Sequence, residues 1–467
     1  MTVPVKPYPA YKDSGVPWLG EVPAHWTQLP GRACYREKKV PNRGMQETTV
    51  LSLSYGQIVI KPVEKLHGLV PASFETYQII DPGNIIVRPT DLQNDWNSLR
   101  FGLARHRGII TSAYMCLNTQ ELVTHEYGHL LLHAYDLKKV FYGLGSGLRQ
   151  NLDWRDLKYL PCLVPPPDEQ RAIVRYLDHV DRRIRRYIGA KQKLVALLNE
   201  QKQAIIQQAV TRGLDPSVQL KPSGVEWLGE VPEHWEVVLN QRIFQEEIRP
   251  HGGQTEVQLS LSQRDGLIAT SAMQERSLQT STYDNWKVTL PGDLVLNRFK
   301  AHLGVFFSST LRGIVSFHYG VFVPRRPLIT KYFELLYHTD AYKTIYAGRS
   351  NGMTVGLQNL SNQNFYNVRS VVPPIQEQVE IVAFAEKATE RLNDAIQNAR
   401  REIALLREYR ARLVADVVTG KLDVREATRG LPEELEEAEP PDEAEALLEG
   451  EEAEACEVDA AIEEADA

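Results

Sequence analysis

The chain has 467 residues, more than one ordinary core needs, and its apolar content of 43% is enough for two packed domains. Its four cysteines lie far apart without a CxxC pair, which excludes a disulfide framework or a cysteine zinc knuckle. The first residues form no apolar signal core, and no segment approaches the roughly 18 apolar residues of a membrane helix. We therefore expect a soluble, cytoplasmic protein with no membrane partner.

The net charge of −7 hides an uneven distribution. From Leu431 to the end there are 17 acidic and no basic residues, so residues 1–430 hold all 53 basic residues and carry a net charge of about +10. We expect residues 426–467 to form an acidic, disordered tail. A basic body favours a polyanionic partner, although a surface that is merely charged explains the pattern equally well.

The chain repeats itself at an offset of about 208 residues. SGVPWLGEVPAHW at 14–26 returns as SGVEWLGEVPEHW at 223–235, and we call these two stretches the opening segments. LSLS, Pro-Gly-Asn/Asp, RGI and PPxxEQ then recur in the same order, so two copies of one structural unit precede the tail. We interpret the tryptophans of the opening segments as a structural clasp rather than as base-stacking residues: Trp18, Trp26, Trp227 and Trp235.

Each copy has a globular part and a helical part. The globular part contains short β-type runs such as VLSLSYGQIVI, bounded by Gly, Pro and Asn turns, which predicts a mixed α/β domain. After PPxxEQ, apolar residues alternate at steps of four and three, a spacing typical of a coiled-coil seam. The expected partner-binding seam includes Ile173, Leu177, Ile184, Leu198, Leu392, Leu406 and Leu413. The predicted boundaries are a first domain at 1–165, a first helix at 166–213, a second domain at 214–373 and a second helix at 374–425.

A helix of this length leaves its apolar seam in water unless another element covers it, and the helix of the other copy is the obvious partner. If the two helices pair antiparallel, the fold is α+β, with two homologous domains joined by two long coiled-coil helices and related by a pseudo-twofold axis. Two similar domains held in this way suit two inverted half-sites on a duplex. The alternative is two separate surface helices, each packed on its own domain.

Residues 125–129 read HEYGH, the HExxH pattern in which two histidines one helical turn apart bind zinc and the glutamate activates water. The repeat provides an internal comparison, because the same helix recurs at 330–348. There the ligand types are lost while the apolar positions persist: His125, Glu126 and His129 become Thr330, Lys331 and Glu334. We therefore expect the packing face of a helix and no metal or other cofactor, and we keep a zinc metallopeptidase as the first alternative function.

The candidate DNA-contacting residues lie in polar, basic inserts after the PGN and PGD turns. Affinity for a duplex comes mainly from Lys and Arg on phosphates, and specificity from Arg, Lys, Asn and Gln at base edges. The inserts, at 88–108 and 297–304, differ between the copies while the flanking strands match, as two different half-sites require. Loops after LSLS and glycine-rich turns at 143–150 and 348–353 add further candidates. The full set is Arg88, Gln93, Asn94, Arg100, Arg105, Arg107, Arg149, Arg264, Arg298, Lys300, Arg349 and Asn351. For any single residue, ordinary drift of a surface loop is the simpler explanation.

The duplicated opening segment, the PGN/PGD turn before an apolar strand and the PPxxEQ boundary before each helix resemble the specificity subunit of type I restriction–modification systems. The resemblance covers residues 14 to about 425. It implies a noncatalytic subunit in which each of two target recognition domains reads one half of a split, asymmetric double-stranded DNA sequence. It also implies helices that set the spacing and dock two methyltransferase (modification) subunits, and ATP-dependent restriction (translocase and nuclease) subunits that complete the complex.

The sequence agrees that the chain itself is not an enzyme. It contains no GxxxxGK[ST] phosphate loop, no GxGxxG after a strand and no Asn-Pro-Pro-aromatic run of the amino-methyltransferase kind. The second alternative function is a coiled-coil adaptor that binds proteins but no DNA. An adaptor would show no salt-sensitive binding to any duplex, whereas a DNA-recognition subunit would bind a duplex with an affinity that falls steeply as salt rises.

Overall fold

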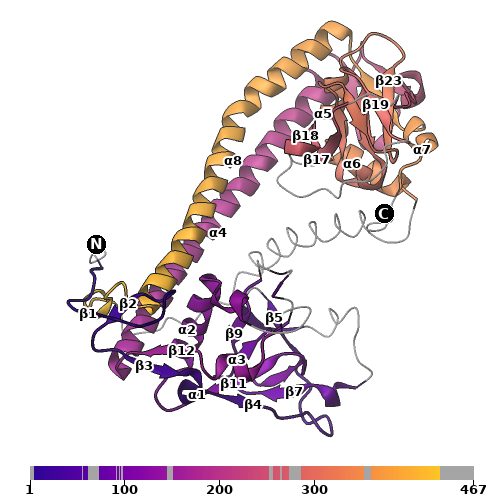
Figure 1. The fold of residues 1–467 in the computed structure, drawn as a ribbon. Helices are drawn as coiled ribbons and strands as arrows, with labels where there is room; N and C mark the ends of the chain where they lie inside the picture. The colour runs from indigo at the N-terminus through magenta and orange to yellow at the C-terminus, as the bar shows by residue number, and fades with distance from the viewer. Residues whose placement is uncertain are drawn as a thin grey trace. The chain divides into compact units, whose positions relative to one another are not determined.

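The computed structural model describes residues 5–54, 56–61, 73–90, 92–93, 95, 98–144, 151–251, 256–262, 266–272, 285–351 and 359–431. Within these residues the chain forms two compact units (Figure 1). The first unit contains the residues up to Ala190 together with those from Arg401 onward, and the second contains Lys191–Arg400. Each long helix therefore contributes one part to each unit, whereas the sequence repeat divides the chain near residue 213.

A four-stranded antiparallel sheet of order β4-β11-β8-β9 forms the centre of the first unit. Its strands are β4 (Tyr35–Lys38), β11 (Met115–Thr119), β8 (Ile85–Val87) and β9 (Phe101–Leu103). Two-stranded ladders accompany it: β1 (Tyr11–Asp13) with β2 (Glu21–Pro23), β3 (Thr27–Pro30) with β12 (Pro161–Val164), β5 (Leu51–Ser54) with β6 (Gln57–Ile60), and β7 (Gln78–Ile80) with β10 (Gly108–Ile110). The short helices are α1 (Gly31–Cys34), η2 (Phe74–Thr76), α2 (His125–Leu137), η3 (Val140–Gly143), α3 (Trp154–Leu157) and, after the second long helix, α9 (Arg425–Arg429).

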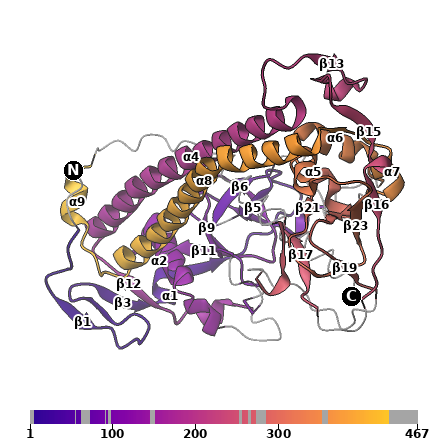
Figure 2. The same ribbon diagram turned by 90° about the horizontal axis from the view of Figure 1, so that it is seen from above.

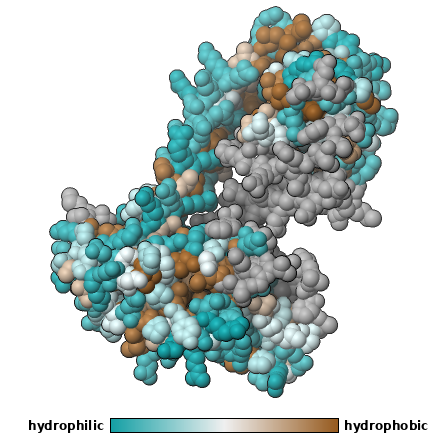
Figure 3. All heavy atoms as spheres, viewed as in Figure 1, coloured by the Kyte–Doolittle hydropathy of each residue, from teal (hydrophilic) through white to brown (hydrophobic). Residues whose placement is uncertain are grey.

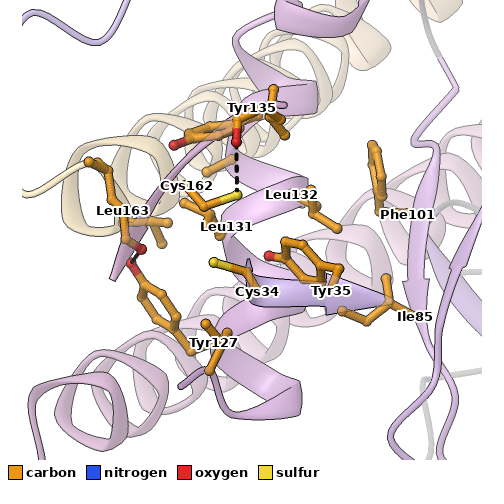
Figure 4. Close-up of a cluster of buried hydrophobic side chains, with 14 of the residues drawn as sticks. Cys34, Tyr35, Ile85, Phe101, Tyr127, Leu131, Leu132, Tyr135, Cys162 and Leu163 are labelled. Atoms are coloured by element: carbon orange, nitrogen blue, oxygen red, sulfur yellow. Dashed lines mark hydrogen bonds between the residues drawn. The ribbon is translucent and has the colours of Figure 1, made fainter. Parts of the chain in front are cut away.

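Helix α2 supplies one side of the first core. Tyr127 and Tyr135 lie on its buried face and point among apolar side chains from the sheet and from β12 (Figure 4). The Tyr127 hydroxyl donates a hydrogen bond of 3.0 Å to the carbonyl oxygen of Leu163, which satisfies its polar group inside the core. Cys34 and Cys162 are buried in the same cluster as free thiols.

The second unit repeats this architecture, with a four-stranded antiparallel sheet of order β16-β23-β20-β21. Its strands are β16 (Phe244–Glu246), β23 (Tyr319–Pro324), β20 (Leu294–Asn297) and β21 (Phe306–Ser308). The ladders are β13 (Leu220–Pro222) with β14 (Glu230–Pro232), β15 (Glu236–Leu239) with β24 (Arg369–Val372), β17 (Leu259–Ser262) with β18 (Gly266–Ala269), and β19 (Lys287–Thr289) with β22 (Gly313–Val315). The short helices are η4 (Glu226–Leu228), η5 (Asn240–Arg242), η6 (Thr270–Ala272), η7 (Arg298–Leu303), α5 (Thr330–Tyr337), α6 (Asp340–Arg349) and α7 (Asn362–Tyr366).

The two long helices are α4 (Pro167–Arg212) and α8 (Ile375–Val418), and they lie side by side in both views (Figures 1 and 2). In the first unit, Ile184 and Ile188 of α4 pack against Ile403 of α8, and Asp181 forms an ion pair with Arg410. As residue numbers rise along α4, those of its contacts on α8 fall, so the helices are antiparallel. In the second unit, Lys202 Nζ donates to Asn393 Oδ1 at 2.8 Å in the same sense. The α+β fold class with paired antiparallel helices is confirmed.

The expected seam residues divide by exposure. Ile173, Leu177, Ile184 and Leu413 are buried, whereas Leu198, Leu392 and Leu406 are half-buried. The buried members pack within this chain, against the first domain or the other helix. These four residues therefore stabilise the chain itself, and partner binding by Leu198, Leu392 and Leu406 stays a prediction.

Each long helix ends at a glycine that lies against a tryptophan of an opening segment. Helix α8 stops at Val418, before the predicted boundary at 425, and Gly420 follows with a φ of +80°. A Cβ on Gly420 would lie 3.1 Å from the Trp26 ring, and a Cβ on Gly213, after α4, would lie 3.3 Å from the Trp235 ring. Both glycines have a positive φ, which L side chains rarely adopt, so conformation and space together require glycine there.

The glutamate of each PPxxEQ motif binds the opening segment of the same copy. Glu169 accepts a hydrogen bond of 2.9 Å from Trp26 Nε1 and lies 2.8 Å from His25 Nε2. Glu377 accepts a hydrogen bond of 2.9 Å from Trp235 Nε1. Because Trp26 and Trp235 are each only 1% exposed, they are unavailable for base stacking, and the clasp interpretation is confirmed for these two residues.

Candidate nucleic-acid interface

Helix α2 carries the HEYGH residues, and its histidines contact other parts of the first domain. His125 Nδ1 lies 2.7 Å from Thr119 Oγ1, and His129 Nε2 lies 3.3 Å from the carbonyl oxygen of Phe101. Burial lowers the pKa of His129 to about 4, which favours the neutral imidazole. Across the residues that the structure describes, no group of three His, Cys, Asp or Glu side chains is arranged to hold a metal ion.

The second copy explains why position 129 is polar. Glu334, the counterpart of His129, accepts hydrogen bonds from the backbone N–H and the hydroxyl of Ser308 at 2.8 and 2.7 Å. Ser308 lies on β21, the equivalent of β9, which contains Phe101. In both copies this helix position binds the strand beside it, which favours a packing role over a zinc site.

Several basic side chains of the first insert are bound within the chain. Arg88 Nη1 lies 3.3 Å from Asp95 Oδ2. Arg107 forms an ion pair with Asp81, although its side chain stays 54% exposed. Arg105 is exposed in the turn before β10, so it is the first-insert arginine best placed to meet a phosphate.

Arg100 requires a correction. Its side chain is fully buried and donates hydrogen bonds to the carbonyl oxygens of Thr90 and Asp95, both at 2.6 Å. Its backbone N–H donates to Asp136 Oδ2 at 2.8 Å. The expected DNA contact at Arg100 is therefore wrong, because this guanidinium holds the insert together from inside. A buried arginine needs carbonyl oxygens that only the folded insert supplies, so the pattern of basic residues did not reveal it.

In the second domain, the insert and the glycine-rich turn meet. The insert forms η7, and the carbonyl oxygen of Arg298 accepts a hydrogen bond of 3.0 Å from the N–H of Leu360. Asn351, within the glycine-rich turn, and Asn359, which precedes Leu360, exchange backbone hydrogen bonds of 2.9 and 2.7 Å. Two regions selected separately from the sequence therefore come together at one surface.

The first domain makes the same connection, because the N–H of Leu152 donates to the carbonyl oxygen of Pro89 at 2.8 Å. Among the other expected contacts, Gln93 and Arg349 are exposed and Lys300 is half-buried. Three expected contacts lie outside the described residues: Asn94, Arg149 and Arg264.

A pocket of about 350 Å³ opens beside η7 in the second domain. Arg298 and Phe299 of η7 line it, together with Phe317 and His318 from the turn between β22 and β23. Phe317 is 48% exposed, and its ring centroid lies 3.8 Å from that of His318. The pocket therefore combines a cation with accessible aromatic surface, two features that nucleic-acid sites use.

Glu246 of β16 organises the polar side of this pocket. Its carboxylate accepts hydrogen bonds from Arg298 Nη2 at 2.7 Å and Lys287 Nζ at 3.3 Å, and a further one from the Asn362 amide. Lys287 Nζ also donates to the carbonyl oxygen of Tyr319 at 2.8 Å. One carboxylate thus orients the arginine, while the lysine holds the turn that carries the aromatic residues.

The pocket side chains differ from their counterparts in the first copy. Equivalent positions in the two copies make equivalent contacts. Gln78 Nε2 donates a hydrogen bond of 2.6 Å to the carbonyl oxygen of Tyr114, and Lys287 Nζ donates one to the carbonyl oxygen of Tyr319. In sequence order, Lys287, Arg298, Phe317 and His318 replace Gln78, Pro89, Ser112 and Ala113. Sequence reasoning missed Glu246, Phe317, His318 and Asn362 as site residues. The sequence did contain a signal for Phe317 and His318. The matched segments RGIITSAY (107–114) and RGIVSFHY (312–319) differ by the replacement of Ser-Ala with Phe-His.

Apolar side chains are also exposed on the long helices. Leu197 of α4 and Leu405 of α8 are 54% and 58% exposed and occupy equivalent positions of the two copies, one in each unit. Leu194 and Tyr409, which are exposed as well, lie three and four residues from them and so share their helix faces. The visible surface of the helices is otherwise mostly hydrophilic (Figure 3). None of the described helices has the length and apolar content that crossing a bilayer requires.

Comparison with known proteins connects these features with one class. The chain is 26% identical over 159 residues to the type I restriction enzyme MjaVIII specificity subunit of Methanocaldococcus jannaschii, which covers 33% of this chain and 35% of that protein. It is 29% identical over 110 residues to the putative type I restriction enzyme MjaX specificity subunit of the same organism, covering 23% of this chain and 24% of that protein. The chain thus spans about a third of the first relative and about a quarter of the second in these matches. No protein-family model matches the chain.

The fold has a counterpart among solved structures. A chain described under "Structural basis underlying complex assembly and conformational transition of the type I R-M system" superposes with a TM-score of 0.58 at 14% identity, covering 86% of this chain and 99% of that chain. By sequence and by fold, this protein is similar to components of type I restriction–modification systems. Its sequence relatives are specificity subunits, and the resemblance drawn from the duplicated motifs is confirmed.

Proposed function

We propose that this chain is the DNA-recognition subunit of a type I restriction–modification complex, with each globular domain reading one half of a split, asymmetric duplex target. The observation that carries the proposal is the duplication, since two domains of one sheet order present different side chains at equivalent places. For example, Arg298 of the second domain occupies the position that Pro89 occupies in the first domain. Two different readers on a common scaffold suit a target whose two halves differ. The likeness to type I specificity subunits supports the same conclusion.

Contacts with the duplex are proposed at the inserts and at the bases of the glycine-rich turns. In the first domain, Arg105 and Gln93 are exposed and suited to phosphates and base edges. In the second domain, Arg349 and Asn351 are exposed beside η7, which carries Lys300. Arg88 and Arg107 already form ion pairs with Asp95 and Asp81 of this chain, so we expect each to contribute less to DNA binding than Arg105 does.

Two methyltransferase subunits are proposed to dock on the helices, one at Leu197 and one at Leu405. On each helix the exposed leucine has a second exposed apolar side chain on the same face, Leu194 beside Leu197 and Tyr409 beside Leu405, and such clusters suit a surface that another protein covers. Equivalent positions in the two copies provide equivalent surfaces, which suits two identical partners. ATP-dependent restriction subunits would join this assembly, and methyl transfer and cleavage would belong to the partners rather than to this chain.

Binding of the full chain to a mixed-sequence duplex should fall steeply with salt. Because each neutralised phosphate contributes a slope of about −0.9, phosphate contacts by the three cations Arg105, Lys300 and Arg349 imply a loss of affinity of about 40-fold between 50 and 200 mM salt. Fluorescence anisotropy at several salt concentrations measures this slope. Arg105→Gln should reduce it by about one. Arg326→Gln should leave it unchanged, because Arg326 follows β23 at the end away from the insert and pairs with Glu236. No detectable duplex binding at low salt would support the adaptor instead.

A further inference from the structure

We propose that the pocket beside η7 is the base-reading site of the second domain, and that Arg298 within it selects a guanine in the second half of the target. This inference rests on the proposed function and deepens it by naming the residues that read one half. It is independent of whether the other candidate residues contact phosphates.

The first argument is the chemistry and orientation of Arg298. A guanidinium has five N–H donors, and its double hydrogen bond to O6 and N7 of guanine is the commonest specific contact in the major groove. Glu246 accepts from Nη2 of Arg298 at 2.7 Å, which fixes the direction of the side chain. The side chain remains 20% exposed and lines the pocket. An arginine oriented by a second residue loses little conformational freedom on binding, so it discriminates between bases efficiently.

The second argument is the apolar rim. Ile248 and Phe317 line the same pocket and are 66% and 48% exposed, which is unusual for large apolar side chains around a polar site. Next to a cation, such side chains are suited to the face or the methyl group of a base. A phosphate would gain nothing from them. The mixture therefore favours a base over the sugar–phosphate backbone as the occupant.

The third argument is a deficit of hydrogen bonds in the pocket lining. Arg298 Nε and Asn362 Oδ1 are buried and have no hydrogen-bond partner among the described residues. A buried polar atom without a partner destabilises the fold, and native proteins rarely keep one without a reason. A ligand in the pocket, or water carried with it, would supply the missing partners of these atoms. This deficit is expected of a site that its ligand completes.

The fourth argument is that the pocket chemistry belongs to one copy. The scaffold around it is shared, yet Arg298 and Phe317 stand where the first copy has Pro89 and Ser112. The shared backbone hydrogen bonds do not require this difference, because Leu152 binds the carbonyl oxygen of Pro89 as Leu360 binds that of Arg298. A residue that reads a half-site must differ when the two halves differ.

The test is to express the full chain with its methyltransferase subunit and to map methylated adenines by single-molecule sequencing. Arg298→Lys keeps the charge but removes the fork of donors, so discrimination for guanine at one second-half position should fall by at least about 10-fold. A Phe317→Ser, His318→Ala double variant installs the first-copy residues and should also alter the second half only. Arg326→Lys is the matched control, because it changes an arginine that pairs with a glutamate at the same 2.7 Å outside the pocket.

An unchanged second half in both pocket variants would overturn the inference, as would a second half without guanine that tolerates Arg298→Lys. If the pocket variants changed the first half of the methylated motif, the pocket would not be reading the second half. That result would overturn the inference as well. If Arg298→Lys prevents assembly, the double variant decides the outcome. Failure of the proposed function looks different, because the unmodified chain would then give no split motif at all.

Discussion

Replacing Trp26 with alanine is expected to destabilise the first unit by about 3–5 kcal/mol, the usual cost of removing a large buried aromatic side chain. Trp26 is 1% exposed, donates to Glu169 and lies against the glycine that ends α8. Its loss would open a cavity, leave a buried carboxylate with one partner fewer, and loosen the end of a long helix. Hydrogen exchange of the strands β4, β11, β8 and β9 in the full chain measures the effect.

The second copy provides the matched control. Trp235→Ala removes the equivalent clasp of the second copy. It should lower the protection from hydrogen exchange in the sheet of the second unit and leave the protection of the first sheet unchanged. Trp26→Phe retains most of the ring and should cost less, near the 1–3 kcal/mol of an unpaired buried acceptor. A loss below about 1 kcal/mol in Trp26→Ala would contradict the clasp as a source of stability.

Aspartate at both exposed leucines, Leu197 and Leu405, is expected to abolish docking of the methyltransferase subunits. A central apolar contact at an interface contributes about 2 kcal/mol or more, and a charge in its place adds a desolvation cost, so each site should lose at least about 30-fold in affinity. Each single variant should retain one docked partner. Mass photometry of the co-expressed proteins counts the bound subunits directly.

Ala196→Asp and Ala404→Asp are the controls for these variants. Both alanines are exposed, precede the leucines by one residue and occupy equivalent positions in the two copies. They introduce the same charge about 100° around the helix, so docking should persist while the effect on helix stability is similar. If the leucine and alanine variants lose partners equally, the leucines do not define the docking surfaces.

Much of the fold follows from the repeat. Matched opening segments and PPxxEQ motifs predict two domains of one topology, and the strand orders β4-β11-β8-β9 and β16-β23-β20-β21 agree with that prediction. The apolar steps of four and three along both helices predict a paired seam, and the predicted seam residue Ile184 does pack against the other helix. Its buried partner there, Ile403, was not among the predicted seam residues, whereas the predicted Leu406 is only partly buried in that cluster. These features were accessible because periodic burial leaves a periodic sequence.

Other features depend on contacts between distant residues, which periodicity does not encode. Arg100 appears in the sequence as one more basic residue of an insert, and only the carbonyl oxygens around it show that it is structural. The pocket at Arg298 forms only where β16, β19 and the turn before β23 come together, so no single stretch of the sequence predicts it. The predicted disordered tail began at 426, but Arg425–Arg429 form α9 with Ala427 and Thr428 buried, so the start of that prediction is wrong. The acidic residues from 432 onward lie outside the described residues, and their disorder stays a prediction.

The central claim is that this chain selects the DNA sequence that a methyltransferase modifies. The most direct test is to map methylated adenines in a host that expresses the methyltransferase subunit with and without the full chain. The account predicts a split, asymmetric motif that appears only when the chain is present, and whose first half alone changes when residues 88–108 are exchanged for those of another such chain. A stable complex that produces no motif, or the same motif without this chain, would contradict it.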